Sequence, residues 1–347
     1  MQTVKAYAAK KEKEPLVPFE ITRRDVGPND VLIDIKFCGI CHSDIHCARN
    51  EWGFSLFPMV PGHEIAGIVA EAGANVKRFK KGDKAGVGCL VGSCGACGDC
   101  RAGLEPYCPT PIWTYGALDK DGKTLTQGGY SERIVVDERF VLRIPDNLPL
   151  AAAAPLLCAG VTTYSPLRHW KAGPGNKVAV VGLGGLGHVA VKIAKALGAE
   201  VTVLSHSNKK EADAKRFGAH HFHATSDPKT FENLARSFDL MLNTVSVELN
   251  WNQYLALLKT NGTLVILGIP EKSPAVAPFS LIGGRRSLAG SLIGGLPETQ
   301  EMLDFCGKHN ILSDIEIIPV QKVNEAYERV IQGDVRYRFV IDTASLK

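Results

Sequence analysis

The 347-residue sequence lacks several features that would place it in a specialised class of protein. Aromatic residues make up only 7% of it and its net charge at pH 7 is only +4. Nucleic-acid-binding proteins concentrate Lys and Arg far more strongly, so we expect no nucleic-acid partner. With 45% hydrophobic and 22% charged residues, the composition is that of a globular chain and argues against disorder.

The sequence also lacks a long hydrophobic run. Its longest uncharged apolar stretch, 178–191, is rich in Gly and is shorter than a membrane-spanning helix requires. Residues 1–13 mix acidic and basic side chains and contain no apolar segment of the kind found in secretory signals. We therefore expect a cytoplasmic protein without a membrane partner. In a reducing compartment, its ten cysteines are better explained as metal ligands than as disulfides.

The length of the chain and a change in its pattern of apolar residues predict two domains, since 347 residues exceed the size of a single hydrophobic core. Residues 4–149 show short apolar alternations broken by Gly, Pro and Asp, which predicts a β-rich unit. Beyond residue 154, apolar strands alternate with helices, which predicts a doubly wound parallel sheet, the Rossmann α/β fold. We place the dinucleotide domain at 156–295 and a catalytic domain at 1–155, to which 296–347 returns. The expected strands are 31–35, 65–69, 133–136, 177–181, 201–204, 240–242, 264–267 and 338–341.

Four cysteines lie within fifteen residues in a Gly-rich segment: Cys94, Cys97, Cys100 and Cys108. Thiolates at this C-x2-C-x2-C-x7-C spacing can converge tetrahedrally on Zn²⁺ and leave no open position, which predicts a structural zinc. An iron–sulfur cluster is the alternative, but the ferredoxin run ends in C-x3-C-P, which is missing here. Cys89 breaks the regular spacing and is expected to be a small buried residue. Taken alone, the four cysteines would equally suit a zinc ribbon.

A second set of ligand-type residues is scattered along the chain. Cys41, Ser43, Asp44 and His46 fall within six positions, and the other members are His63, Glu64 and Cys158. Two cysteines and one histidine would give a zinc site with an open fourth position, as catalysis needs. Spacing alone supports this weakly, because a single cysteine in an apolar segment is usually a core residue.

A glycine-rich loop follows the expected strand 177–181. The segment Gly182-Leu183-Gly184-Gly185-Leu186-Gly187 fits G-x-G-x-x-G and opens an expected helix, which is the context of a dinucleotide-binding turn. Its backbone N–H groups could approach a pyrophosphate at the helix N-terminus.

The next expected strand, 201–204, is followed by a segment without a carboxylate, which contains Ser205, His206, Ser207 and Lys210. An acid at this place would bind the ribose 2′-hydroxyl of NAD. Glu200 precedes the strand and lies roughly 16 Å from the binding end, at about 3.3 Å per residue. Hydroxyls with nearby cations suit a 2′-phosphate, so the sequence predicts NADP(H).

With these motifs, the chain resembles the zinc-dependent medium-chain dehydrogenases, in the branch of the cinnamyl alcohol dehydrogenases. It is most similar to the bacterial NADP-dependent aldehyde reductases of that branch. The matching blocks lie at 39–46, 61–64, 94–108, 128–131, 155–167, 290–295 and 336–342. The resemblance implies a GroES-like catalytic domain beside the Rossmann domain and two zinc ions per subunit. It makes Cys41, His63 and Cys158 the catalytic zinc ligands and Glu64 a transient one, while Asp44 fixes the tautomer of His63.

The resemblance further implies the chemistry: hydride transfer between a primary alcohol and NADP(H), with zinc polarising the oxygen. The proton would pass from Ser43 through the nicotinamide ribose hydroxyl to His46. Thr162 and Ile293 would contact the nicotinamide. An apolar slot for aromatic or medium aliphatic aldehydes would be lined by Trp52, Leu56 and Trp113. Relatives pair through a strand near 291–293, so we expect a homodimer.

Three alternatives stay open at this point. An NAD-linked polyol dehydrogenase is disfavoured by the missing acid at Ser205 and by the apolar slot. A zinc-stabilised nucleic-acid-binding protein would explain the four cysteines but not the low net charge or the second, open metal site. A catalytically silent regulator could use the same fold, although intact zinc ligands argue against it.

Overall fold

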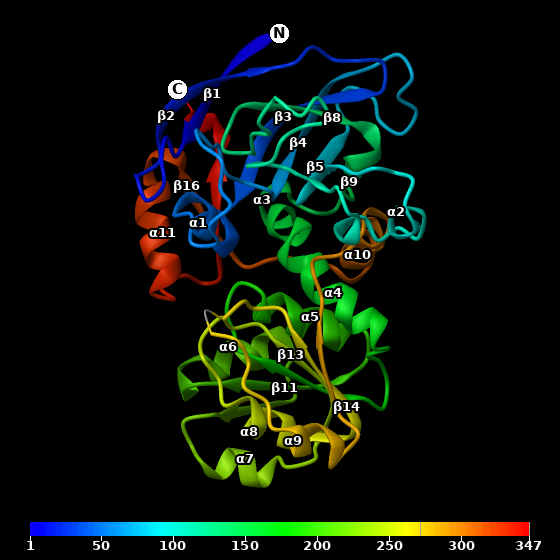
Figure 1. Ribbon diagram of the computed structural model, residues 1–347, viewed down its shortest axis with the longest axis vertical. Helices are drawn as coiled ribbons and strands as arrows, with labels where there is room; N and C mark the ends of the chain where they lie inside the picture. Colours follow the sequence, from blue (N-terminus) through cyan, green and yellow to red (C-terminus); the bar gives the residue numbers. More distant parts are fainter. Residues whose placement is uncertain (271, 347) are drawn as a thin grey trace. The chain divides into compact units, whose positions relative to one another are not determined.

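The computed structural model describes residues 1–270 and 272–346 (Figure 1). The chain divides into two compact units. One consists of Met1–Cys158 together with Gly295–Lys347, and the other of Ala159–Gly294. The chain therefore leaves the first unit once and returns to it for its last fifty residues or so.

The first unit is built on a seven-stranded sheet with the order β16-β17-β3-β4-β5-β9, in which β8 also pairs with β3. Most of its neighbours are antiparallel, and only β16 and β17 run parallel. The strands are β3 (Asp30–Gly39), β4 (Ile65–Ala72), β5 (Lys84–Val87), β8 (Arg133–Asp137), β9 (Leu142–Arg143), β16 (Ile315–Pro319) and β17 (Arg338–Asp342). Two small sheets accompany it: β1 (Gln2–Ala8) with β2 (Val17–Arg23), and β6 (Leu90–Gly92) with β7 (Ile112–Trp113).

Strand β3 is the centre of this sheet because it pairs with β4, β8 and β17. Its first residues, Val31, Leu32 and Ile33, are buried on both faces, which explains their continuous apolar character. The helices of the unit are α1 (His42–Ala48), α2 (Gly98–Arg101), α3 (Leu150–Ala153), α10 (Leu296–His309) and α11 (Val323–Ile331).

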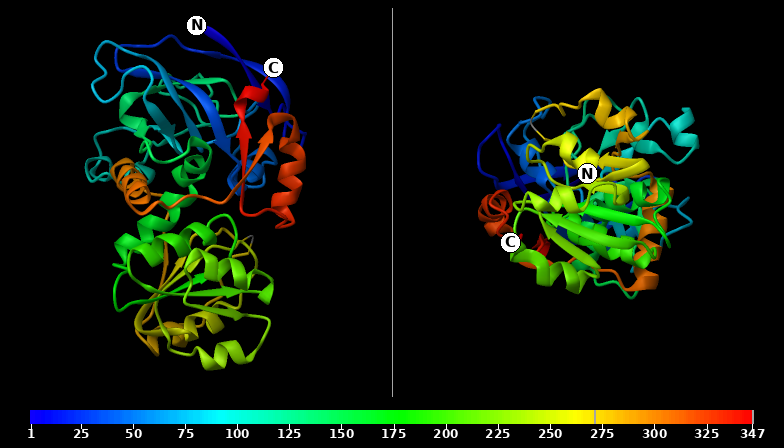
Figure 2. Two further views of the ribbon diagram at one scale, coloured as in Figure 1. Left: turned by 180° about the vertical axis from the view of Figure 1, so that it is seen from behind. Right: turned by 90° about the horizontal axis from the view of Figure 1, so that it is seen from below.

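The second unit is a six-stranded sheet in which every neighbouring pair is parallel, in the order β12-β11-β10-β13-β14-β15. Helices lie on both faces of it (Figure 2), so the predicted doubly wound Rossmann fold is confirmed. The strands are β10 (Lys177–Val181), β11 (Glu200–Ser205), β12 (His221–Ala224), β13 (Phe238–Asn243), β14 (Leu258–Ile266) and β15 (Ser287–Gly290). The helices are α4 (Ala159–His169), α5 (Gly187–Ala196), α6 (Glu211–Phe217), α7 (Lys229–Asn233), α8 (Trp251–Ala256) and α9 (Pro278–Ile282).

The order of these strands reverses between β10 and β13, where the chain leaves β10 for β11 on one side and later returns for β13 on the other. In doubly wound sheets, ligands bind at the carboxyl ends of the strands at this reversal. The core beneath it is apolar and includes Met241, Trp251 and Leu264. The sheet therefore presents the glycine-rich loop, which follows β10, at the expected position.

The strand that the family resemblance implies near 291–293 corresponds to β15, which ends at Gly290, one residue before that range. Residues 291–293 lie outside the strand, and Ile293 has a φ of +42°, which is incompatible with extended backbone.

Among the described residues, no single helix combines the length and apolarity needed to cross a membrane. One bent pair, Leu150–Leu157 with Ala159–His169, reaches that length and composition when its two halves are taken together.

Candidate functional site

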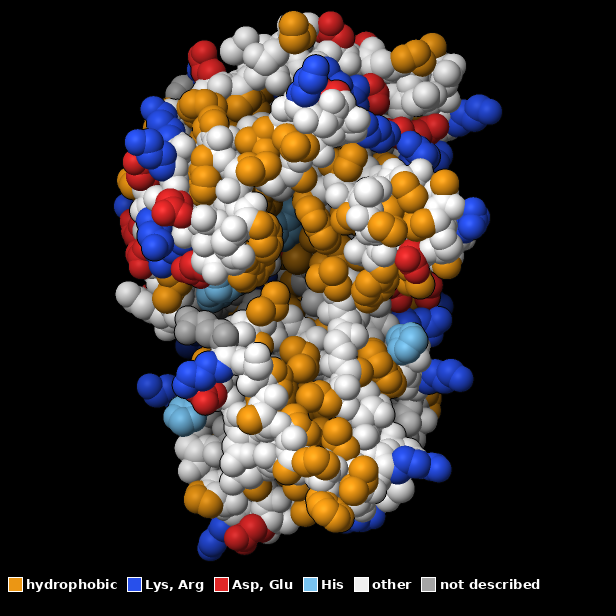
Figure 3. All heavy atoms as spheres, viewed as in Figure 1, with side chains coloured by type: hydrophobic (Ala, Val, Ile, Leu, Met, Phe, Trp, Pro, Cys, Tyr) orange, Lys and Arg blue, Asp and Glu red, His pale blue; other side chains and the backbone are white. Residues whose placement is uncertain are grey.

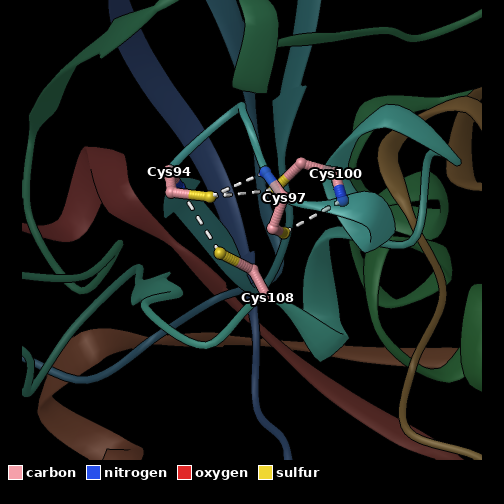
Figure 4. Close-up of side chains that lie close together, drawn as sticks. All are labelled: Cys94, Cys97, Cys100 and Cys108. Atoms are coloured by element: carbon pink, nitrogen blue, oxygen red, sulfur yellow. Dashed lines mark hydrogen bonds between the residues drawn. The ribbon is translucent and has the colours of Figure 1, made fainter.

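The four-cysteine lobe follows β6 and is shown in Figure 4. Cys97 precedes α2 as its N-cap, Cys100 lies in that helix, and Cys108 follows a short 3-10 helix. The four Sγ atoms lie within 4.8 Å of one another, and all four thiols are free. The left-handed conformation of Gly95 (φ +68°) allows the tight turn between the first two cysteines.

Backbone N–H groups point at these sulfurs. The N–H of Cys97 donates to Cys94 Sγ at 3.3 Å, and that of Cys100 donates to Cys97 Sγ at 3.4 Å. Cys108 Sγ accepts from the N–H of Cys94, and this hydrogen bond contributes most to lowering the pKa of Cys108 to about 6. Four converging thiols, with donors that favour the thiolate form, are the donor set of a structural zinc site.

The second cluster consists of four buried residues, Cys41, His63, Glu64 and Cys158, whose ligand atoms also lie within 4.8 Å of one another. Cys41 and Cys158 are 117 positions apart in the sequence, yet their Sγ atoms are 3.9 Å apart. The structure thus brings together the three predicted zinc ligands and the predicted transient ligand. All four belong to the first unit.

The register of the large sheet explains this convergence. In the antiparallel pair of β3 and β4, Cys38 lies opposite Ile65, so Cys41 follows β3 at the same sheet end where His63 precedes β4. Strand β5 adds the segment after Val87 at that end. There a Cβ on Gly88 would lie 3.0 Å from the Leu157 carbonyl oxygen, so glycine allows the close approach that brings in the neighbouring Cys158.

His63 is held in one orientation. Its Nδ1 lies 3.2 Å from Asp44 Oδ1, and its ring stacks on that of Tyr115 at 5.6 Å between centroids. Burial alone would lower the pKa of His63, but the charges of Cys89 and Asp44 outweigh burial and raise it well above its usual value. With one ring nitrogen facing Asp44, the other is left to a ligand, as in carboxylate–histidine–zinc arrangements.

Glu64 has one buried oxygen that lacks a hydrogen-bond partner among the described residues. One of its oxygens pairs with the buried guanidinium of Arg338, on β17. Its Oε2 is buried and has no hydrogen-bond partner in the part of the chain that the structure describes. Burial raises the pKa of Glu64 to about 8, although Arg338 opposes the shift. A buried oxygen without a partner is costly, and a metal beside Cys41 and Cys158 would relieve that cost, so the residues fit a zinc ion.

Helix α1 carries the residues predicted to move the proton. Ser43 Oγ lies 3.6 Å from Cys41 Sγ, at the buried cluster. His46 lies one turn further along, where its Nδ1 contacts the Glu51 carboxylate and its ring stacks on Trp52 at 5.0 Å. The imidazole is one-fifth exposed. A single short helix therefore connects the ligand cluster to solvent.

The residues predicted to line the substrate slot all lie in the first unit. Trp52 also stacks on Phe54, with ring centroids 5.8 Å apart. Leu56, a few positions further on, is 42% exposed. Trp113 lies on β7, in the small sheet beside the cysteine lobe. Of these three side chains, Trp52 stacks on His46, one of the predicted proton-transfer residues.

The glycine-rich loop connects β10 to α5. Gly182 has a φ of +91°, and a Cβ on Gly187 would lie 2.1 Å from the Gly182 carbonyl oxygen, so both positions require glycine. A Cβ on Gly184, by contrast, would meet no described atom within 4 Å. Backbone at Gly184 is therefore open to a ligand at the N-terminus of α5, as a pyrophosphate requires. Gly185 and Leu186 complete the turn.

The end of β11 lies beside this loop. Ser205 is its last residue, His206 and Ser207 follow, and Lys210 Nζ donates to the Leu183 carbonyl oxygen at 2.9 Å. Glu200 lies at the other end of β11, where it pairs with Lys177 and His221. No carboxylate among these residues therefore faces the loop. Thr162, on α4, and Ile293 also belong to the second unit.

Several residues at these sites were not predicted. Glu51, Arg338 and Tyr115 contact His46, Glu64 and His63, respectively. Tyr130 donates to Asp44. Arg338, Tyr115 and Tyr130 have no local spacing signal, because each reaches its partner through the tertiary fold. Glu51 lies only five positions after His46, but no motif marks it. The blocks 128–131 and 336–342, which contain Tyr130 and Arg338, were the available hints, since both are part of the family resemblance.

Comparison with known proteins identifies the same family as the sequence motifs do. Residues 27–146 match the alcohol dehydrogenase GroES-like domain, and residues 185–308 match the zinc-binding dehydrogenase domain. The chain is 63% identical, over the full length of both proteins, to NADP-dependent alcohol dehydrogenase C 1 of Mycolicibacterium smegmatis.

Two solved structures are similar throughout. A cinnamyl alcohol dehydrogenase from Sorghum bicolor has a TM-score of 0.96 and 43% identity, covering 100% of this chain and 99% of that one. The enzyme named CAD from Helicobacter pylori, solved with NADP(H), has a TM-score of 0.93 and 46% identity, covering 99% and 98%. The chain therefore belongs to the zinc-dependent medium-chain alcohol dehydrogenases, in the branch that contains the cinnamyl alcohol dehydrogenases.

Proposed function

We propose that this protein is a zinc-dependent, NADP(H)-linked alcohol dehydrogenase and aldehyde reductase that acts on primary alcohols and on aromatic or medium aliphatic aldehydes. The observation that carries the proposal is the buried cluster of Cys41, His63 and Cys158, with the unpartnered Glu64 oxygen beside it. A relative of 63% identity is named as an NADP-dependent alcohol dehydrogenase. The four cysteines of the lobe would hold a second, structural zinc.

In this proposal Cys41, His63 and Cys158 hold the catalytic zinc and leave one position for the substrate oxygen, with Glu64 as a transient ligand. When bound, zinc supplies a Lewis acid for that oxygen, and the dinucleotide supplies the hydride acceptor or donor. The role of the chain is to exclude water and fix the ligands. Asp44 orients His63, and the burial of both cysteines keeps the site dry.

The chain also has to move one proton between the buried oxygen and water. Ser43 Oγ, next to Cys41, is the group at the buried end. His46 is the group at the solvent end, and Glu51 holds its Nδ1 so that the other ring nitrogen can exchange the proton. Trp52 packs against His46 and, with Leu56 and Trp113, would give an apolar wall for the substrate.

The cofactor we propose is NADP(H), bound by the glycine loop 182–187 with Thr162 and Ile293 at the nicotinamide. Ser205, His206, Ser207 and Lys210 would surround the 2′-phosphate. The proposal is supported by the absence of a carboxylate at the end of β11, since Glu200 lies at its other end. The same feature argues against the alternative of an NAD-linked polyol dehydrogenase.

We also propose a homodimer in the cytoplasm. Strand β15 is the edge of the parallel sheet, and the adjacent α9 exposes Phe279 (80%) and Ile282 (65%). Figure 3 shows hydrophobic side chains gathered over this part of the second unit. An unpaired edge with exposed apolar side chains can pair with a second copy. A reducing compartment would keep both cysteine groups available for zinc.

The purified protein should contain two zinc ions per chain, one for each of the two ligand groups. Cys97→Ser removes one ligand of the lobe and should leave a single zinc, measured by plasma emission spectroscopy. Cys306→Ala, which changes a cysteine outside both groups, should retain both ions. Unchanged zinc content in Cys97→Ser would refute the structural zinc.

Ser43→Ala should lower kcat for alcohol oxidation by roughly a hundredfold, because general acid–base groups contribute on that scale. Its zinc content should stay that of the wild type, since Ser43 is not a ligand. Ser55→Ala is the matched control: that hydroxyl donates to the Cys47 carbonyl oxygen and should not affect kcat. An unaltered kcat in Ser43→Ala would eliminate the proton-transfer role.

The wild type should have a higher kcat/KM for NADPH than for NADH. Ser205→Asp places a carboxylate against the 2′-phosphate and should shift the ratio towards NADH by about tenfold or more, as repulsion of this kind costs at least ~1.4 kcal/mol. The neutral isostere Ser205→Asn should keep the preference for NADPH. A wild type that uses NADH as well as NADPH would contradict the assignment.

Sedimentation should give a species of twice the chain mass of 37.4 kDa. Phe279→Glu with Ile282→Glu should shift it towards the monomer, because each introduces a charge into the proposed apolar interface. Leu118→Glu, at another exposed leucine, should not. A monomeric wild type at micromolar concentration would refute the dimer.

A further inference from the structure

The carboxylate of Asp44 accepts hydrogen bonds from several parts of the first unit although it is completely buried. Its Oδ1 accepts from the N–H of Gly62 at 3.1 Å and faces His63 Nδ1 at 3.2 Å. Its Oδ2 accepts from the N–H of Cys41 at 2.8 Å and from the phenol of Tyr130 at 3.1 Å. Each oxygen thus has at least two partners, which fixes the plane of the carboxylate.

Tyr130 is the one side-chain donor to Oδ2 among these contacts, and its own position is tightly constrained. Its side chain is fully buried, and a Cβ on Gly62 would lie 2.7 Å from its ring, so the ring packs against the backbone that leads into His63. The guanidinium of Arg23 donates to the carbonyl oxygens of Gln127 and Gly128, at 2.8 and 2.9 Å. The segment that carries Tyr130 is therefore anchored to β2.

We propose that Tyr130 is a positioning residue that acts through Asp44 to hold His63 on the catalytic zinc. The inference rests on the proposed function, because it assumes that Cys41, His63 and Cys158 bind that zinc. Without the phenol, Oδ2 loses one of its two short hydrogen bonds, and the carboxylate can rotate away from the plane in which Oδ1 faces His63. The imidazole then loses the partner that fixes its orientation, and zinc is released more readily.

The test uses Tyr130→Phe, which removes one oxygen and keeps the ring. The holoenzyme is mixed with a chromogenic zinc chelator, and the release of the two ions is followed over time. Loss of an outer-shell partner of a ligand typically costs 10–100-fold in metal affinity, which sets the scale for Asp44→Asn. Tyr130 is one contact further away, so we expect its variant to release the catalytic zinc roughly three- to tenfold faster than the wild type. Release from the four-cysteine lobe should be unchanged.

Tyr254→Phe is the matched control because it removes a phenol from the buried core of the second unit and should not alter either rate. A double-mutant cycle then separates positioning from a general structural role. In the Asp44→Asn background, Tyr130→Phe should accelerate zinc release no further.

Three results would overturn the inference. Tyr130→Phe could release the catalytic zinc at the wild-type rate, its effect could add in full to that of Asp44→Asn, or it could accelerate release from both sites alike. If Tyr130→Phe does not fold, Tyr130→Leu, which also lacks the hydroxyl, is measured in the same cycle. A wild type that holds only the lobe zinc would instead refute the proposed catalytic zinc itself.

Discussion

The register of one antiparallel strand pair determines most of the proposed active site. Because Cys38 lies opposite Ile65, the chain leaving β3 and the chain entering β4 meet at one end of the sheet, which brings Cys41 to His63. Strand β17 pairs with β3 so that Val340 lies opposite Gly39, and this places Arg338 within reach of Glu64. A slip of one residue would turn these side chains to the other face of the sheet. The ligand cluster and the sheet are therefore specified by the same contacts.

The two cysteine groups are stabilised in different ways. The lobe is local: its four sulfurs come from fifteen consecutive residues, and backbone N–H groups of the same segment donate to them. The Cys41–Cys158 group is buried and long-range, and it contains a carboxylate oxygen without a partner. Four thiols that fill every coordination position suit a structural zinc. In the buried group the fourth residue is the carboxylate Glu64, which a substrate oxygen could replace at a catalytic zinc.

Local signals predicted the second unit well. The apolar run 177–181 coincides with β10, and the glycine loop follows it. Both were predictable because a buried parallel strand requires consecutive apolar residues and a tight turn requires glycine. The strand near 291–293 was implied by the family resemblance alone, and the structure places it slightly earlier, at β15, with a backbone turn at Ile293. The hairpin of β1 and β2 carries a weaker pattern and was not predicted.

The site itself could be predicted only in part. The lobe was visible in its spacing, whereas Cys41, His63 and Cys158 emerged as a set only through the family resemblance, since sheet register is not encoded in any short window. The supporting residues Tyr130 and Arg338 were missed because each contacts its partner across the tertiary fold. Glu51 was missed although it lies five positions after its partner His46, because no motif marks it. Their roles follow from hydrogen bonds and burial, which no pattern of residue types conveys.

Cys158→Ser provides the most direct test of the central claim that Cys41, His63 and Cys158 form the working zinc site. The account predicts that this variant keeps the lobe zinc, loses the other, and oxidises NADPH with an aromatic aldehyde more than about a hundredfold more slowly, because the Lewis acid supplies several kcal/mol. A variant that loses neither zinc nor rate would contradict the account.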